Sequence, residues 1–180
     1  MTSATYTIGP AAEAPAPTPT PAPSTTQTPR GGGIKPQAPK KVDISPHDDP
    51  EIWYNSTSSK FAWDVPYGIT GVRIGFDQDE EADPSETHSP PIAETTIDIA
   101  EDGIWYFHLA FQNRNGWGDA AHFKIQVDST PPEAFDVTAE GGDLQSTLTF
   151  NSSDGLSGIE EYRIIVDGVE VKSLKPGDIP

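Results

Sequence analysis

The chain has 180 residues, a net charge of −17 and no Cys. The acidic balance excludes a nucleic-acid-binding protein, because contact with the phosphate backbone requires a basic stripe on the protein surface, and it argues equally against an anionic membrane surface. The absence of Cys excludes a disulfide scaffold and a thiolate metal site, and no stretch of about 18 apolar residues is present that could cross a membrane.

Residues 1–41 are predicted to form a disordered linker rich in Pro and Thr. Nine of the 19 Pro lie between Pro10 and Pro39, and small residues alternate with Pro over 14–23, which favours an extended polyproline II spacer. Residues 1–9 alternate weakly, so they form either one short strand or an ordinary disordered terminus. The linker also holds the only basic cluster of the sequence, which consists of Arg30, Lys35, Lys40 and Lys41.

Residues 42–128 are predicted to form a complete β-sandwich. Apolar and polar residues alternate over short runs, no helical period occurs, and Gly, Pro, Asn and Asp fill the turns between the runs. Six or seven short strands in a segment of this length are typical of a sandwich. The clearest strands are expected at 61–65, 72–76, 95–99, 105–111 and 121–127.

The strand at 105–111 is expected at the centre of this sandwich. Read with period two, its odd-numbered positions form a wholly apolar face that belongs in the core. The predicted structural core comprises Trp63, Trp105, Phe107, Leu109, Phe111 and Phe123. Tyr106 and His108 lie on the other face and are predicted to point outward.

Residues 129–180 are predicted to begin a second β unit that is incomplete. Ser129-Thr-Pro-Pro132 reads as a stiff hinge, three short strands follow, and Asp167-Gly168 is a strong signal for a hairpin turn. The return strand after this turn, with Val169 and Val171, is the fourth, and four strands in a segment of this length make a poor sandwich. We therefore expect open sheet edges in this unit.

Two stretches resemble a known fold family. Phe61-Ala-Trp-Asp-Val-Pro66 resembles the second strand of a fibronectin type III or related Ig-like domain, and the stretch 102–116 resembles the sixth strand. In that family a Tyr at the start of the sixth strand forms the tyrosine corner. The corner position falls on Trp105, which departs from the pattern because an indole has an N–H donor and no hydroxyl.

A more specific resemblance is to the Ig-like repeats of modular bacterial surface (envelope) proteins. The segments that resemble these repeats are 53–55, 61–63, 102–108, 115–118 and 127–132, and the tail around 154–162 is similar to a following repeat. The resemblance implies an Ig-like or fibronectin-III-like sandwich at 42–128 and a partial second Ig-like domain at 129–180. It also implies an extracellular or cell-surface location, for which the chain itself shows neither a signal nor an anchor.

Two acidic groups are candidates for binding Ca²⁺. The first alternates carboxylates along one loop, as Ca²⁺ loops do, although Ala82 stands where an EF-hand requires Gly. The second lies at the junction between the two β units, where Glu133 could contribute as well. The candidate ligands are Asp77, Asp79, Glu81, Asp83, Asp128 and Asp154, and a solvated acidic surface is the simpler interpretation of both groups.

His108 and His122 form a second metal candidate. If their strands pair as a hairpin around Asn115-Gly116, the two imidazoles face each other and could bind Zn²⁺ or Cu²⁺. No third ligand is evident, and Arg73, the expected neighbour on the next strand, would oppose a cation. Half-buried surface His residues are therefore predicted. No cofactor is predicted, and Ca²⁺ is the one candidate retained.

No catalytic residues are predicted. Gly155-Leu-Ser157-Gly158-Ile159 lacks the spacing of a nucleophile elbow, and the acidic residues lie in turns where nothing would raise a carboxyl pKa. The sequence therefore favours a non-catalytic structural module that spaces or presents neighbouring domains.

The alternative function is an adhesion module that binds carbohydrate or protein. Four aromatic residues, Trp53, Tyr54, Tyr67 and Trp117, are expected in turns rather than in the core. They could stack on sugar rings or simply cover the open ends of the sandwich, and the second interpretation is favoured. The partners considered are polysaccharide or another surface protein.

Overall fold

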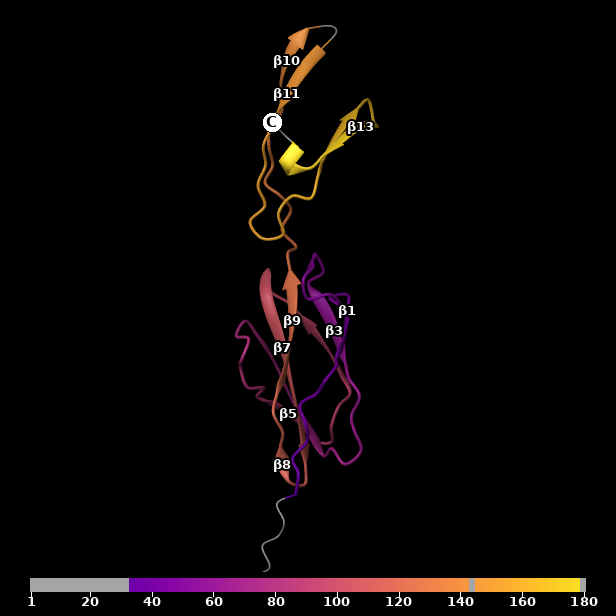
Figure 1. Ribbon diagram of the computed structural model, residues 1–180, viewed down its shortest axis with the longest axis vertical. Helices are drawn as coiled ribbons and strands as arrows, with labels where there is room; N and C mark the ends of the chain where they lie inside the picture. Colours follow the sequence, from indigo (N-terminus) through magenta and orange to yellow (C-terminus); the bar gives the residue numbers. More distant parts are fainter. Residues whose placement is uncertain (1–32, 143–144, 179–180) are drawn as a thin grey trace, which may run out of the picture. The chain divides into compact units, whose positions relative to one another are not determined.

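A computed structural model describes residues 33–142 and 145–178 of the chain (Figure 1). Residues 1–32 of the predicted linker over 1–41 lie outside the described residues. The described part is all-β, as predicted, with one short 3-10 turn at Pro176–Asp178. Its strands are β1 (Asp43–Ser45), β2 (Trp53–Tyr54), β3 (Ser58–Ala62), β4 (Gly71–Asp77), β5 (Glu86–His88), β6 (Glu94–Asp98), β7 (Gly103–Asn113), β8 (Gly116–Trp117), β9 (Ala121–Val127), β10 (Thr138–Gly142), β11 (Gln145–Thr149), β12 (Tyr162–Val166) and β13 (Val169–Leu174).

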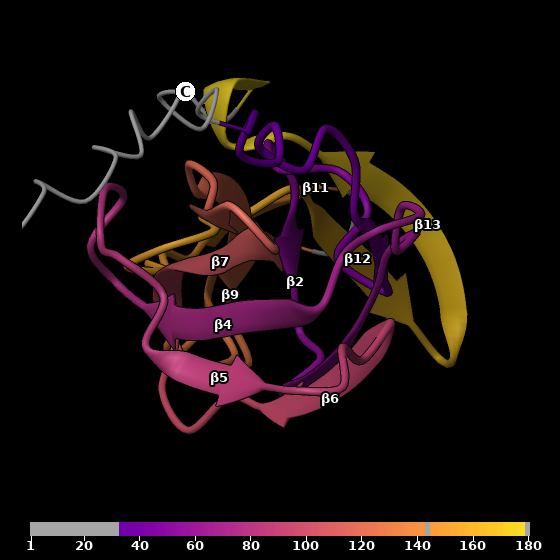
Figure 2. The same cartoon turned by 90° about the horizontal axis from the view of Figure 1, so that it is seen from below.

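The first nine strands form two sheets. The smaller sheet has the order β1-β3-β6, and the larger has the order β2-β9-β7-β4-β5, with β8 paired to the end of β7. All pairs are antiparallel except β2 with β9, which is parallel. Figure 2 looks along the strands and shows the larger sheet as one layer. Such an arrangement of two facing, mainly antiparallel sheets is consistent with the predicted β-sandwich.

The core lies between the two sheets. Phe61 of β3 stacks on Phe107 of β7 with ring centroids 4.2 Å apart, and Trp63 packs against the same ring at 5.7 Å. The buried cluster comprises Val42, Phe61, Trp63, Val72, Ile74, Ile99, Phe107, Leu109, Phe111, Ile125 and Val127. Trp105 and Phe123 are partly buried at its edge. The apolar face predicted for 105–111 is thus the face that lies in the core.

The outer face of the larger sheet is covered at His108, where the sequence predicted an outward-facing residue. His108 is 0% exposed, and Ala110 is buried beside it. The loop after β4 folds back over the sheet and buries Pro84 there. Gly75 allows this approach, because a Cβ at that position would lie 3.1 Å from Cα of Pro84. Strand alternation identifies the face of a residue, but a loop can bury that face from the outside.

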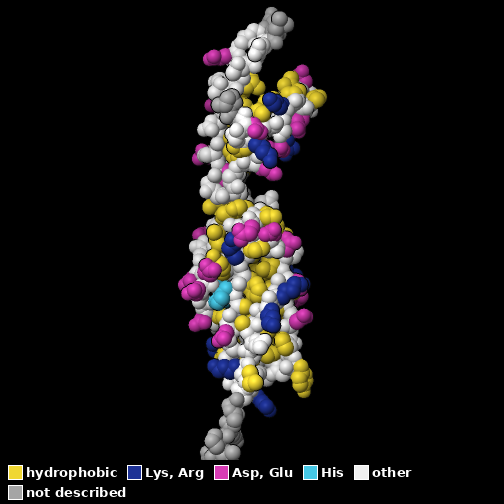
Figure 3. All heavy atoms as spheres, in the orientation of Figure 1, with side chains coloured by type: hydrophobic (Ala, Val, Ile, Leu, Met, Phe, Trp, Pro, Cys, Tyr) yellow, Lys and Arg dark blue, Asp and Glu magenta, His cyan; other side chains and the backbone are white. Residues whose placement is uncertain are grey.

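Residues 129–178 form two separate hairpins, β10–β11 and β12–β13. The predicted turn at Asp167-Gly168 is present, and both residues have positive φ. Phe135, Phe150 and Tyr162 form a small aromatic cluster with ring centroids 5.0–6.0 Å apart. Many apolar side chains of this segment remain at the surface (Figure 3), including Val137, Leu148, Ile165, Val166, Val169 and Val171.

Candidate functional site

Candidate sites lie at the two ends of the sandwich. We call the end with the β7–β8 turn, at Asn113–Gly116, the turn end, and the end where β9 finishes beside the start of β7 the exit end. The described chain begins at the turn end and leaves the sandwich at the exit end. Each end is held by side chains that the sequence distributes over distant segments.

At the turn end, residues 33–39 lie against the sandwich. The backbone carbonyl of Ile34 accepts hydrogen bonds from Nδ2 of both Asn113 and Asn115, each 2.9 Å long. Gly118 leaves room for the backbone carbonyl of Pro36, and Pro39 is buried. The sequence places the start of the sandwich at residue 42, but contacts with the sandwich begin earlier, at residues 33–39.

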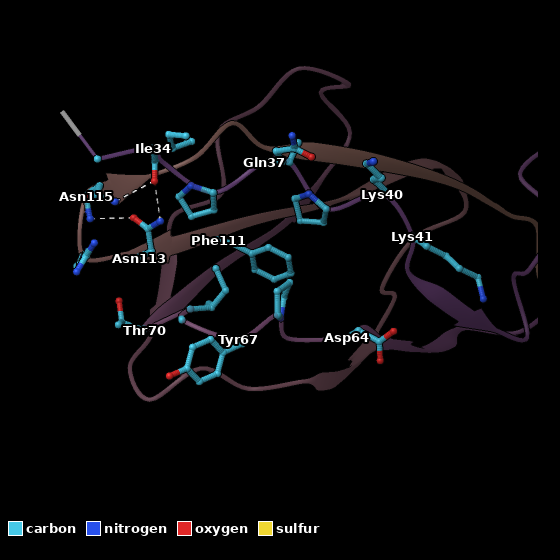
Figure 4. A pocket seen from close by; sticks show the side chains of 18 residues that line it. Ile34, Gln37, Lys40, Lys41, Asp64, Tyr67, Thr70, Phe111, Asn113 and Asn115 are labelled. Carbon is cyan, nitrogen blue, oxygen red and sulfur yellow. Dashed lines mark hydrogen bonds between the residues drawn. The ribbon is translucent and has the colours of Figure 1, made fainter. Parts of the chain in front are cut away.

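These residues form one wall of a groove of about 1050 Å³ (Figure 4). The loop between β3 and β4 forms the opposite wall, with Pro66 and Tyr67, and the β7–β8 turn closes one end. Phe111 lies between the walls, and in Figure 4 Lys40 and Lys41 lie at the other end from Asn113 and Asn115. Prolines and aromatic residues give the groove an apolar lining with polar groups at its margins.

The charged residues of the groove are mainly basic. Lys40, Lys41 and Arg114 line it together with a single carboxylate, Asp64. The hydrogen bond from Lys41 to Asp43 raises the pKa of Lys41 above its ordinary value. A basic groove on a chain with a net charge of −17 is a local reversal of the overall electrostatic character.

At the exit end, Asp102 holds the segment that follows β9. Its Oδ1 accepts hydrogen bonds from the backbone N–H of Ser129 at 2.9 Å and from the Ser129 hydroxyl at 2.7 Å. Its Oδ2 accepts one from the Thr130 hydroxyl at 2.6 Å. The hydrogen bond from Thr130, followed by those from Ser129, lowers the pKa of Asp102 to about 2. The carboxylate is therefore the acceptor that fixes the first residues after the sandwich.

Asp128 forms a second link at the same end. Its Oδ1 accepts a hydrogen bond from the N–H of Thr130 at 3.2 Å, and its Oδ2 accepts one from the N–H of Ser157 at 2.8 Å. The bond from Ser157 is the main cause that lowers the pKa of Asp128. This side chain therefore ties the end of β9 to the segment between β11 and β12.

Replacement of Asp102 by Asn should weaken this end in a pH-dependent way. The carboxyl pKa is about 2 in the folded chain against an ordinary value of 3.8. A depressed carboxyl pKa contributes stability that is complete above the unfolded pKa and is lost as the pH falls through the folded one. We expect Asp102→Asn to lower the melting temperature at neutral pH and the difference from the wild type to shrink between pH 4 and 2. Calorimetry across this pH range measures both melting temperatures, and a difference that stays constant with pH would contradict the prediction.

The Ca²⁺ candidates do not form converging ligand sets. Within the described ranges, no group of three or more His, Asp or Glu side chains is placed to hold a metal ion. Oδ1 of Asp77 instead accepts a hydrogen bond from the N–H of Asp79, and Oδ1 of Asp79 accepts one from Glu81. Oδ1 of Asp154 likewise accepts bonds from its own turn, at Leu156 and Gly158. These carboxylates stabilise turns, as Asp commonly does.

His108 and His122 do face each other across β7 and β9, with their Nδ1 atoms 2.7 Å apart. Nε2 of His108 lies 3.4 Å from Oδ1 of Asp77. Two imidazoles can satisfy both contacts when Nδ1 of His122 donates to Nδ1 of His108 and Nε2 of His108 donates to Asp77. Nε2 of His108 points to Asp77, so only Nδ1 of each His would face a metal ion placed between the two rings. Two nitrogens are too few for a Zn²⁺ or Cu²⁺ site.

The sequence suggested that Arg73 is the cross-strand neighbour of His108, and this prediction is wrong. Arg73 pairs with Ala110, while Gly75 pairs with His108. The guanidinium of Arg73 lies 4.2 Å above the ring of Trp117, in a cation–π arrangement. The error is a register shift of two residues, which leaves the face correct and the neighbour wrong.

Burial should make the two inner His residues a source of acid sensitivity. Burial lowers the pKa of His108, outweighing the nearby Asp77, and also lowers the pKa of His47, outweighing its hydrogen bond to the carbonyl of Ser56. A His whose pKa falls on folding contributes stability above its unfolded pKa of 6.5 that is lost as the pH drops through the folded value.

We therefore expect the melting temperature to fall between pH 7 and 5, and His108→Gln to make that fall shallower. Differential scanning calorimetry at matched ionic strength measures both slopes. Equal slopes in the wild type and the variant would show that His108 stays neutral in both states or is equally protonated in both.

The aromatic candidates separate into two kinds. Trp53 and Tyr54 form β2, and Trp117 belongs to β8, so these three are in short strands rather than in the expected turns, and all are half-buried. The Tyr54 hydroxyl donates to Asp48 at 2.8 Å, and Trp117 lies beneath Arg73. Tyr67 alone is fully exposed, at 107%, and it stands on the rim of the groove.

The groove was not predicted as a unit. Lys40 and Lys41 belong to the basic cluster that the sequence assigns to a linker, and Asn113 and Arg114 belong to the turn after the central strand. Nothing local in the sequence indicates that these segments meet. The signal that could have suggested a site is the concentration of basic residues in a chain that is otherwise strongly acidic.

The fold and its ends define an all-β protein whose sandwich has a basic groove at one end and a carboxylate-held exit at the other. Among known proteins, no family model matches this chain, and no curated protein matches it either. Within the part of the chain that the structure describes, no helix is long and apolar enough to span a membrane.

Proposed function

We propose that the chain is a non-catalytic structural module of an extracellular or cell-surface protein, which spaces or presents neighbouring domains. The observation on which this rests is that the described chain enters the sandwich at the turn end and leaves it at the exit end. The 11 residues of β7 run between these ends. At about 3.3 Å per residue, the strand keeps its two ends roughly 35 Å apart.

The proposal includes an Ig-like or fibronectin-III-like identity for residues 42–128. Two features support it. Three strands face a larger antiparallel sheet around a buried Trp, namely Trp63, as in Ig-like sandwiches. At the corner position, Nε1 of Trp105 donates a hydrogen bond of 3.0 Å to the backbone carbonyl of Glu101. An indole thereby makes the upstream backbone contact that a Tyr hydroxyl makes in that family.

Hydrogen bonds and prolines at the exit end stiffen the connection between the sandwich and the segment that follows it. Asp102 accepts three hydrogen bonds from Ser129 and Thr130. Pro131 and Pro132 follow directly, and each Pro restricts the backbone to one narrow range of φ. A junction held in this way transmits the direction of the sandwich to the following segment, which is what a spacer requires.

Mechanical unfolding tests this proposal. In optical tweezers, handles at the two ends of the full chain pull along the strands and load their hydrogen bonds together. We expect the sandwich to resist and then to open in one step that releases about 300 Å of chain, since an extended residue spans at most ~3.6 Å.

A matched control pulls on the same fold from one end. Cysteines introduced as Tyr67→Cys and Arg114→Cys place both handles at the turn end, where force separates β4 from β7 one hydrogen bond at a time. The control should open at a clearly lower force. If the end-to-end pull extends gradually, or at the same force as the control, the spacer proposal is wrong.

A further inference from the structure

We propose that the groove at the turn end binds a short stretch of an acidic polysaccharide, of the kind built from uronic acid sugars. This binding activity goes beyond the spacer function and does not depend on it. The inference combines the charge of the groove, the exposure of one aromatic ring and the size and openness of the site.

The charge of the groove selects an anionic ligand. Lys40, Lys41 and Arg114 line it, against the single carboxylate of Asp64. Lys35 adds a fourth cation nearby, because its Cε lies 3.7 Å from the position of a Cβ on Gly116. Figure 3 shows Lys and Arg side chains around this end of the sandwich. Lys41 is already paired with Asp43, so the positive charge of the groove comes mainly from Lys35, Lys40 and Arg114. Charges more than about 8 Å away are screened at physiological salt, which limits the influence of the acidic remainder of the chain.

The same electrostatics limits the charge density of the ligand. The chain as a whole has a net charge of −17, so a long polymer with closely spaced charges, such as a nucleic acid, would be repelled outside the groove. A polysaccharide with one carboxylate per sugar ring has a lower charge density than duplex DNA, which has one charge per about 1.7 Å of helix axis. It can place a few carboxylates near the cations without bringing a dense anion against the acidic surface.

The aromatic and apolar groups indicate a ligand with flat apolar faces. Tyr67 is fully exposed on the rim, although a ring of this size is ordinarily at least partly covered in a folded chain. Phe111 and Pro39 line the groove but are buried, whereas Pro36 is half-buried and Pro66 is exposed, so these two prolines add apolar surface beside Tyr67. Sugar rings offer C–H faces that can pack on such surfaces, while their hydroxyl and carboxylate groups reach the polar margins.

The dimensions also fit several linked rings. A volume of about 1050 Å³ is at the upper end of the range for small-molecule sites, and the groove is partly open to solvent. In Figure 4 the lysines and the Asn113–Asn115 pair lie at opposite ends of the groove, so a ligand that contacts both groups must be extended.

Calorimetric titration of the full chain with hexagalacturonate, a six-ring uronate oligomer, tests the proposal. The methyl-esterified hexamer is the matched control ligand, because it keeps the rings and removes the charges. We expect the acidic hexamer to bind, the ester to bind at least tenfold more weakly, and salt to weaken binding of the acid by about fivefold between roughly 50 and 300 mM.

Three variants locate the binding. Lys40→Glu and Tyr67→Ala should each weaken binding by about tenfold, because one reverses a charge and the other removes the exposed ring. Lys172→Glu, on the exposed face of β13, makes the same charge change elsewhere and should leave affinity unchanged. Circular dichroism of each variant should match the wild type, since all three positions are exposed.

Three outcomes would overturn the proposal. The first is the absence of measurable binding by the acidic hexamer, and the second is equal weakening by Lys172→Glu and Lys40→Glu. The third is equally tight binding of hexaglutamate, an acidic peptide, which would show that the groove recognises charge without sugar rings. Because the mechanical experiment reads unfolding force, the spacer proposal and this one can fail separately.

Discussion

Phe107→Ala should lower the free energy of unfolding by about 3–5 kcal/mol. Phe107 is 0% exposed and stacks on Phe61 at 4.2 Å, where the two sheets face each other. Its removal loses apolar burial and leaves a cavity that the rigid sheets cannot close. Because small domains are stable by about 5–15 kcal/mol, such a loss brings the sandwich close to unfolding at room temperature.

Urea denaturation followed by Trp fluorescence is the appropriate measurement. Trp105→Ala should cost less than Phe107→Ala, because Trp105 is only partly buried and stacks on Phe76 at the edge of the core, 5.1 Å away. Tyr67→Ala is the surface control, with an expected change within about 0.5 kcal/mol. A cost below about 1 kcal/mol for Phe107→Ala would mean that this ring is not at the centre of the core.

Gly118→Ala should detach residues 33–39 from the sandwich and cost about 1–3 kcal/mol, the usual effect of overpacking. A Cβ on Gly118 would overlap the backbone carbonyl of Pro36. No rotation of a side chain can relieve a clash with backbone atoms, so the segment must move. The hydrogen bonds from Asn113 and Asn115 to the carbonyl of Ile34 would then be strained or lost.

Limited trypsin digestion reports this detachment directly. Cleavage after Lys40 and Lys41 should be faster in Gly118→Ala, since a released segment can enter the protease site. Gly155→Ala is the matched control, because a Cβ there meets no atom within 4 Å and should change nothing. A cleavage rate equal to that of the wild type would show that residues 33–39 are held by contacts other than those around Gly118. Loss of one groove wall should also weaken the binding of an acidic ligand.

Local patterns in the sequence predicted the parts of the fold that depend on short-range geometry. The alternation at 105–111 assigned Phe107, Leu109 and Phe111 to the core because strand side chains alternate with a period of two, whatever their partners. The hairpin at Asp167-Gly168 followed from the tolerance of both residues for positive φ. These features are encoded within a few residues, so a single sequence reveals them.

The errors concern contacts between distant segments. His108 was expected at the surface, but Pro84 covers its face of the sheet through a loop that no periodic pattern describes. Arg73 was placed on the correct face beside the wrong neighbour, because face is a local property and register is set by the pairing of two strands. Trp53 and Tyr54 were expected in a turn, and only their pairing with β9 makes them a strand.

The sequence by itself determined the all-β class, the apolar faces and the acidic surface, because composition, period and charge are properties of the chain before it folds. The tertiary structure alone decided which residues form the groove and which residues hold the chain at the exit end. Lys40, Tyr67 and Arg114 are separated by many residues and meet only where the strands end. Asp102 and Thr130 meet because β7 and β9 pair in one register. A binding site made from loops depends on that pairing, and pairing is decided by the packing of the whole core.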